Sequence, residues 1–226
     1  MDGSATKGKG RGDLGLIYHN AQVPEAYLID LDGTLIDSEP WYKKTEVATL
    51  NAFGVPMSLD EMEEFTGLTL RVWLRLINER FGTKLTTEEF LTDYQPKMVR
   101  HVVEDVEMFP DAISFLEQLD GAPAMLVTSS MKWYVDVAMA KFPQIFDSVQ
   151  GIVCEADVLI GKPDPEPYLM AAERLGIGPE KSWVIEDAPN GVKSGQAAGC
   201  HVIAIDRHGS GSVSFADRVV SSLNEI

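Results

Sequence analysis

The fold is decided by one stretch, Tyr27-Leu28-Ile29-Asp30-Leu31-Asp32-Gly33-Thr34-Leu35-Ile36-Asp37. It starts as a short apolar run, which predicts a buried strand over 25–31, and ends in two carboxylates and a glycine. Residues i and i+2 of a strand point to the same side, so Asp30 and Asp32 should project together from the strand's carboxyl end. Gly33 permits the sharp turn that follows.

Two neighbouring carboxylates repel each other unless a cation or a shared proton offsets their charge. An oxygen-binding divalent ion such as Mg2+ is the simplest solution, and open α/β sheets bind their ligands at this edge. Two other interpretations of the stretch remain open. One is a strand followed by a polar turn, because short acidic motifs also occur by chance. The other is a calcium loop, for which 33–41 lacks the required later ligands.

The chain has 226 residues and a formal net charge of −16. This length fits one sizeable domain, or one domain with a substantial insertion, and its 45% apolar content is that of an ordinary globular protein. The strong negative charge argues against nucleic-acid and anionic-membrane partners. An anionic substrate therefore needs a local positive site, such as a metal ion with one or two Lys or Arg side chains.

The chain has only two cysteines, Cys154 and Cys200, and both lie in apolar sequence. Without a disulfide framework, reduced thiols in a cytoplasmic protein are the expected state. No apolar run approaches the length of a membrane span. Residues 1–20 carry Gly, Lys and Arg but no apolar signal core, and we predict a flexible tail there.

After the first strand the apolar periodicity changes to that of helices. Residues 33–40 are predicted to be a turn-rich connection closed by Pro40, followed by four helices with stop signals at Gly54, Gly67 and Gly82. Strands and helices then alternate, which predicts βαβ units and a parallel sheet. The later strands are predicted at 124–127, 151–154, 183–185 and 201–205, the last being the final core strand, and the helices at 110–119, 132–141, 168–175 and 190–198. The predicted domains are a core of 21–38 and 106–226 and a helical insertion of 39–105.

Three further polar signals follow later strands. Thr128 and Ser129 precede a helix, where hydroxyl and N–H groups can hold a phosphate oxygen, although such residues are also common helix caps. Lys162 lies in a proline-rich turn and could neutralise a phosphate or carboxylates, although most lysines are simply solvated. Glu186 and Asp187 could complete a site for a hard cation, or Asp187 could only cap a helix.

All four signals lie at or just beyond the carboxyl end of a predicted strand, so they should meet at one edge of the sheet. In this order they resemble the haloacid dehalogenase superfamily of phosphohydrolases, in the branch (subfamily I) with a helical C1 cap after the first strand. The matching motifs are D-L-D-G-T-L-I-D at 30–37, the Thr128-Ser129 pair, G-K-P-D-P-E-P-Y at 161–168 and E-D-A-P-N-G at 186–191. The resemblance covers about 25–220 and implies a Rossmann-like α/β core with an inserted all-helical cap.

The resemblance also implies a role for each motif residue. Asp30 would be the nucleophile that forms an aspartyl-phosphate, and Asp32 would protonate the leaving oxygen and then activate water. Mg2+ would be held by Asp30, the Asp32 backbone carbonyl and Asp187, with Glu186 behind them or bound through water. Lys162 would stabilise the developing charge and orient Asp30.

The remaining predicted contacts involve phosphate and substrate. The predicted phosphate- and substrate-binding residues are Gly33, Glu39, Arg71, Thr128, Ser129, Lys162 and Asn190. Further candidates on the cap are Trp41, Tyr42, Thr69 and Trp73. Arg71 could instead be a solvated helix residue, and Trp73 could belong to the core of the cap. By resemblance, the cap should close over the substrate and set specificity.

We therefore predict a monomeric, Mg2+-dependent phosphatase of a small phosphorylated metabolite. Sugar and sugar-alcohol phosphates come first, because the sequence at 37–41 resembles hexose-phosphate phosphatases of this branch, and phosphoglycolate comes second. One alternative is a sugar phosphomutase of the beta-phosphoglucomutase type, which carries histidine where this chain has Tyr42 and lysine where it has Met131, although Lys132 is adjacent. A catalytically inactive relative that binds a partner through its cap is the other alternative.

Overall fold

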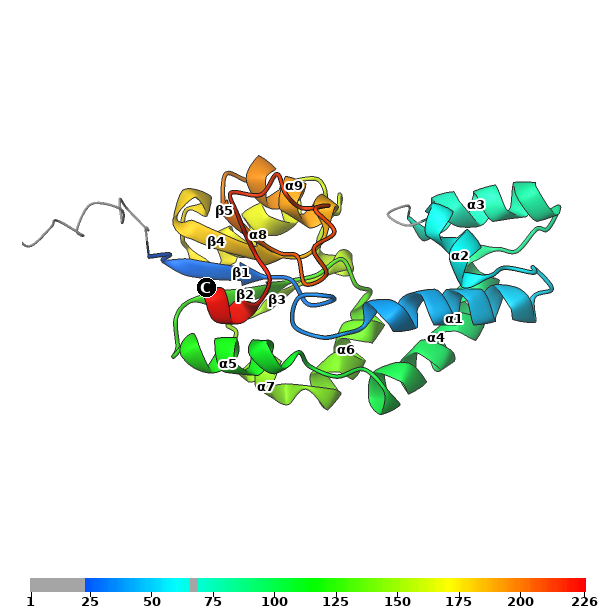
Figure 1. Ribbon diagram of the computed structural model, residues 1–226, viewed down its shortest axis with the longest axis horizontal. Helices are drawn as coiled ribbons and strands as arrows, with labels where there is room; N and C mark the ends of the chain where they lie inside the picture. The colour runs from blue at the N-terminus through cyan, green and yellow to red at the C-terminus, as the bar shows by residue number, and fades with distance from the viewer. Residues whose placement is uncertain (1–22, 66–68) are drawn as a thin grey trace, which may run out of the picture.

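The computed structural model describes residues 23–65 and 69–226. The predicted tail over 1–20 and the predicted helix stop at Gly67 lie outside these residues. Figure 1 shows two parts, an α/β core and a helical lobe that extends from one end of it. The two segments that connect the core to the lobe run side by side. Asp37 N–H donates to the Glu107 carbonyl at 2.9 Å, and Ile36 and Met108 form an isolated β-bridge.

The core is built on one sheet whose six strands are all parallel, in the order β3-β2-β1-β4-β5-β6. The strands are β1 (Ala26–Ile29), β2 (Ala124–Val127), β3 (Ile152–Val153), β4 (Ser182–Glu186), β5 (His201–Ile205) and β6 (Arg218–Val220). β1 lies in the middle and pairs with both β2 and β4. Its short apolar run suits a strand that is covered on both faces.

Helices cover both faces of this sheet, as Figure 1 shows. α5 (Pro110–Gln118), α6 (Lys132–Lys141) and α7 (Pro143–Asp147) lie on one side, and α8 (Glu166–Leu175) and α9 (Pro189–Ala197) on the other. Alternate residues of β1 enter the two cores: Leu28 packs with Tyr168 of α8, and Ile29 belongs to the cluster of Phe115 on α5. The predicted α/β class is confirmed.

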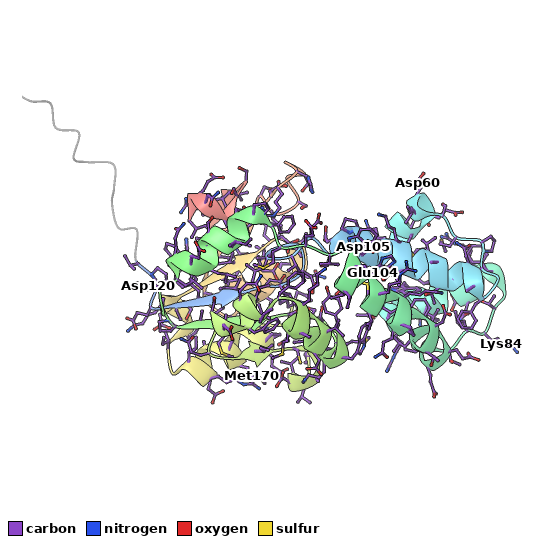
Figure 2. All side chains as sticks on the ribbon, turned by 90° about the horizontal axis from the view of Figure 1, so that it is seen from below. Asp60, Lys84, Glu104, Asp105, Asp120 and Met170 are labelled. Carbon is purple, nitrogen blue, oxygen red and sulfur yellow. The ribbon has the colours of Figure 1, made fainter. Side chains whose placement is uncertain are left out.

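The helical lobe consists of α1 (Glu39–Ala52), α2 (Leu59–Met62), α3 (Leu70–Phe81) and α4 (Thr87–Glu104). α4 starts with a capping box, because Thr86 and Glu89 bond each other's backbone N–H groups. Figure 2 shows Lys84 at the far end of the lobe, and Glu104 near its junction with the core. Across the described ranges, no helix combines the length and apolarity needed to cross a membrane.

Several predicted boundaries were wrong. β1 ends at Ile29 rather than at residue 31, because the chain curls there and Leu35 N–H donates to the Leu31 carbonyl at 2.9 Å. The first cap helix already contains Pro40, since a proline in the first turn needs no N–H partner. The strand at 201–205 is not the last one: β6 follows it, and its exposed Arg218 and Val219 give no apolar run.

Candidate active site

The polar residues after β1 are placed by a tight turn at the centre of the sheet. Asp30 N–H still donates to the Ile185 carbonyl of β4 at 3.0 Å, which fixes it at the carboxyl end of the strands. Gly33 follows with a φ of +78°, and a Cβ there would stand 2.1 Å from Asp187 Oδ2. Only glycine fits this position, because a side chain would meet both backbone strain and the carboxylate.

Lys162 is the buried cation of the site. Its Nζ lies 2.7 Å from Asp30 Oδ1 and 2.7 Å from Glu186 Oε1, and it donates to the Val127 carbonyl at 2.9 Å. The three charged side chains are at most 9% exposed. Burial alone would lower the pKa of Lys162, but Asp30 and Glu186 outweigh it, and the pKa stands well above its usual value. The ammonium group therefore stays charged between two carboxylates.

A third carboxylate, Asp187, completes this charged cluster. Asp30, Glu186 and Asp187 each offer an oxygen within 4.8 Å of the others. Burial, with help from Glu186, raises the pKa of both Asp30 and Asp187 well above the usual range. One lysine does not balance three acids, and carboxylate oxygens are the ligands that Mg2+ prefers. The residues present therefore fit a divalent cation.

Glu186 is turned toward its own loop. Its Oε1 accepts from Lys162 and from the Tyr168 hydroxyl at 3.1 Å, and its Oε2 accepts from the N–H groups of Asp187 and Ala188 at 2.9 Å each. Each carboxylate oxygen thus already accepts two hydrogen bonds. This arrangement favours a supporting role for Glu186 and leaves Asp30 and Asp187 as the better direct ligands.

Asp32 has entirely different surroundings, because every side chain that hydrogen-bonds to it within the described ranges is a hydroxyl. Its Oδ1 accepts from Ser38 at 2.6 Å, Tyr134 at 2.7 Å and Tyr42 at 3.3 Å, and its Oδ2 accepts from Ser130 at 2.6 Å and Thr128 at 3.4 Å. We call these five residues the hydroxyl cage. They supply neutral donors to Asp32, whereas Asp30 receives a charged one.

The predicted phosphate-binding residues surround the two aspartates unevenly. Thr128 is buried, and its Oγ1 accepts the Ser130 N–H at 3.0 Å. Ser129 is exposed and makes no hydrogen bond within the described chain. Asn190 is half-buried in the first turn of α9. Glu39 is exposed at the start of α1, yet its charge contributes to the raised pKa of Asp187, so it lies close to the charged cluster.

The structure does not bring Arg71 to this site. Arg71 lines a separate cavity of about 330 Å³ beside α3 and the start of α4, with Asn78 and Thr86 among its neighbours. Trp73 is buried in the lobe and packs edge-to-face on Phe90 at 5.1 Å between ring centroids. It therefore belongs to the core of the lobe, which was the structural interpretation of this residue.

The other cap candidates have varied positions. Tyr42 reaches Asp32 as described above. Trp41 stacks on His101 of α4 at 4.7 Å between ring centroids, and Thr69 is exposed at the start of α3. Sequence reasoning missed Tyr134 and Ser130 as partners of Asp32, because nothing local to either residue marks it as polar lining of a site.

A family model described as haloacid dehalogenase-like hydrolase matches residues 27–205. The chain belongs to this family. Hexitol phosphatase A of Escherichia coli (strain K12) is 31% identical over 217 residues, which cover 89% of this chain and 93% of that one. (DL)-glycerol-3-phosphatase 2 of Arabidopsis thaliana is 26% identical over 207 residues, covering 87% and 86%. The structure of a candidate beta-phosphoglucomutase of Thermotoga maritima superposes with a TM-score of 0.73 at 26% identity, covering 88% and 95%.

Proposed function

We propose that this protein is a Mg2+-dependent phosphatase of small phosphorylated metabolites, with sugar and sugar-alcohol phosphates as its first substrate class. One observation carries the proposal: Lys162 bridges Asp30 and Glu186 at 2.7 Å each, beside Asp187, at the carboxyl edge of the sheet. Membership of a hydrolase family and the likeness to hexitol and glycerol-3-phosphate phosphatases support the substrate class.

Asp30 is the proposed nucleophile. Lys162 holds its Oδ1, while no described residue donates a hydrogen bond to its Oδ2. That oxygen keeps its lone pairs for attack on phosphorus, which forms an aspartyl-phosphate and releases the alcohol. Lys162 also offsets the negative charge that builds up when an anion attacks an anion.

Asp30, Asp187 and the Asp32 backbone carbonyl are the groups that would hold Mg2+. When bound, the ion neutralises phosphoryl oxygens and so permits a carboxylate to approach them. The Thr128 hydroxyl would receive a phosphoryl oxygen, and Gly33 and Asn190 border the same edge. Glu186 keeps Lys162 in place.

Asp32 is the proposed acid and base. In its protonated form it would give its proton to the leaving oxygen, and as a carboxylate it would then take one from the water that attacks the aspartyl-phosphate. Hydrolysis restores Asp30 and yields inorganic phosphate. We further propose a cytoplasmic location, because Cys154 and Cys200 are both buried free thiols, as suits a reducing compartment.

A sugar phosphomutase is the second candidate, and the structural likeness to a candidate beta-phosphoglucomutase is the observation that favours it. A mutase must bind a second phosphate, however. Met131 offers no charge for it, and the Tyr42 hydroxyl is occupied by Ser130 at 3.1 Å and by Asp32. A phosphatase binds a single phosphate group, so it needs no second phosphate site at these two residues.

The test is phosphate release from a panel of hexitol, hexose, glycerol and glycolate phosphates, with and without Mg2+. Beta-glucose 1-phosphate is included with a read-out for isomerisation. Asp30→Asn is the inactive control, and Asp136→Asn, an exposed acid on α6, is the matched control that should keep wild-type activity. Mg2+-dependent release that is lost only in Asp30→Asn is the expected result. Isomerisation without phosphate release would establish the mutase. The absence of both phosphate release and isomerisation with every compound would overturn the proposal.

A further inference from the structure

The hydroxyl cage around Asp32 is assembled from three separate parts of the chain. Ser38 and Tyr42 come from the junction with the helical lobe and from α1, Thr128 and Ser130 follow β2, and Tyr134 lies on α6. None of the four motifs of the family resemblance contains Tyr42, Ser130 or Tyr134. The tertiary fold, rather than the local sequence, therefore brings the five hydroxyl groups to the Asp32 carboxylate.

Both phenol groups of the cage face the Asp32 carboxylate, whose oxygens accept hydrogen bonds. Burial, and then the charge of Asp32, raise the pKa of Tyr42 and of Tyr134 well above the usual value. Tyr134 donates to Asp32 Oδ1 at 2.7 Å and Tyr42 donates to the same oxygen at 3.3 Å, so the two phenols fix the direction in which this oxygen points.

The ring of Tyr134 is held rigidly in its place. It is only 1% exposed, and it packs between Trp133 at 5.9 Å and Tyr42 at 5.5 Å, measured between ring centroids. The Tyr42 hydroxyl also lies 3.1 Å from Ser130 Oγ, which borders it on a second side. Because these groups have little freedom, they define where the Asp32 carboxyl group lies.

The hydroxyl cage keeps the Asp32 carboxylate away from the positive charge beside Asp30. Two aspartates that stand two residues apart would both be attracted by Lys162 and by a cation beside Asp187. Yet only Asp30, Glu186 and Asp187 form the cluster of carboxylates within 4.8 Å, and Asp32 stands outside it. Neutral hydroxyl donors satisfy its carboxylate without adding a positive charge.

We propose that Tyr134 and Tyr42 are positioning residues that hold the carboxyl group of Asp32 apart from the charged cluster and ready for proton transfer to the leaving oxygen. This inference rests on the proposed function, in which Asp32 is the acid. Without the phenols, the carboxyl group loses its fixed orientation, and the step that needs its proton becomes slow. The attack by Asp30 itself stays intact.

The leaving group separates these two steps. An alkyl phosphate such as a hexitol phosphate needs a proton on its leaving oxygen, whereas 4-nitrophenyl phosphate leaves without one. In single-turnover experiments with the Mg2+-loaded enzyme, Tyr134→Phe should slow release of the alkyl alcohol about 10- to 100-fold and leave release of 4-nitrophenolate within about 2-fold. Tyr42→Phe should act in the same direction with a smaller effect, because its bond to Asp32 is the longer one, 3.3 Å.

Tyr94→Phe is the matched control. Tyr94 belongs to the same aromatic cluster, at 6.5 Å from Trp133, but does not hydrogen-bond to Asp32. It should leave both leaving groups unaffected. If the wild type hydrolyses the substrates and Tyr134→Phe slows both leaving groups equally, or neither, the inference fails while the proposed function stands. If the wild type itself releases neither alcohol, the proposed function has failed.

Discussion

Asp30 and Asp32 are two residues apart in the sequence, but they lie in opposite kinds of surroundings. Asp30 shares Lys162 with Glu186 in a cluster of buried charges, and Asp32 accepts five hydroxyl groups and no charged donor within the described chain. The same side chain therefore meets a charged donor at one position and neutral hydroxyl donors two residues later, and the two roles proposed above rest on this difference in partners. The motif supplies two acids, and the fold gives them different partners.

The largest expected effect comes from exchanging each aspartate for asparagine. Asp30→Asn removes the nucleophile and should lower kcat by at least about 10⁴-fold for every substrate. Asp32→Asn should also stop turnover, yet it should keep a rapid first release of 4-nitrophenolate, because that step needs no acid. Stopped-flow absorbance of both variants checks this. Loss of the first release in Asp32→Asn would show that the two acids do not act separately.

Replacing Lys162, the buried cation of the site, tests the charged cluster next. Lys162→Met leaves Asp30 and Glu186 buried without their ammonium partner, and breaking a buried ion pair costs about 3–5 kcal/mol of unfolding free energy. Urea denaturation at pH 7.5 measures this loss. Lys132→Met, at an exposed pair on α6, is the control and should leave the free energy of unfolding nearly unchanged. Equal losses in the two variants would contradict the account.

Gly33→Ala should damage cation binding without removing any ligand. The new Cβ would stand 2.1 Å from Asp187 Oδ2 and push that carboxylate away. We expect the Mg2+ concentration for half-maximal activity to rise about 10- to 100-fold. Gly121→Ala is matched in backbone strain, with a φ of +80°, but has no atom within 4 Å of the new Cβ. An unchanged Mg2+ requirement in Gly33→Ala would place the ion elsewhere.

Substitution of Glu46, a half-buried acid on α1, should give the smallest effect. Burial raises its pKa to about 7, although Lys43 opposes the shift. The folded state therefore binds its proton more tightly than the unfolded state, and stability should fall as pH rises from about 4.5 to about 7. Glu46→Gln should remove this fall and stabilise the protein at pH 8 by about 1–2 kcal/mol, allowing for residual exposure. Thermal unfolding of both proteins at pH 4.5 and 8 measures it, and parallel pH profiles would refute the assignment.

Much of the fold was readable from apolar periodicity. Short apolar runs and alternation with helices predicted a parallel sheet, and the rule that ligands bind at its carboxyl edge predicted that Asp30, Lys162 and Glu186 would lie together. β6 was missed because Arg218 and Val219 are exposed, so no apolar run marks an edge strand. Periodicity reports burial, and it is silent where an element is half solvated.

The hydroxyl cage could not be predicted in the same way. Tyr134 looks like an ordinary apolar position on a helix, and Tyr42 was predicted only as a candidate substrate contact on the cap. Only the packing of α6 against the junction with the lobe brings their hydroxyls to Asp32. Arg71 shows the converse, since its charge suggested a substrate contact although the fold places it at a separate cavity. Residue type indicates what a side chain can do, and tertiary packing decides what it meets.

The most direct test of the account uses Asp32→Asn mixed with 4-nitrophenyl phosphate and Mg2+, quenched in acid, and measured by intact mass spectrometry with peptide mapping. The account predicts that one phosphoryl group accumulates on the peptide that contains Asp30, because the nucleophile still attacks but water is no longer activated. Release of 4-nitrophenolate with no added phosphoryl group, or with the group on another residue, would contradict it.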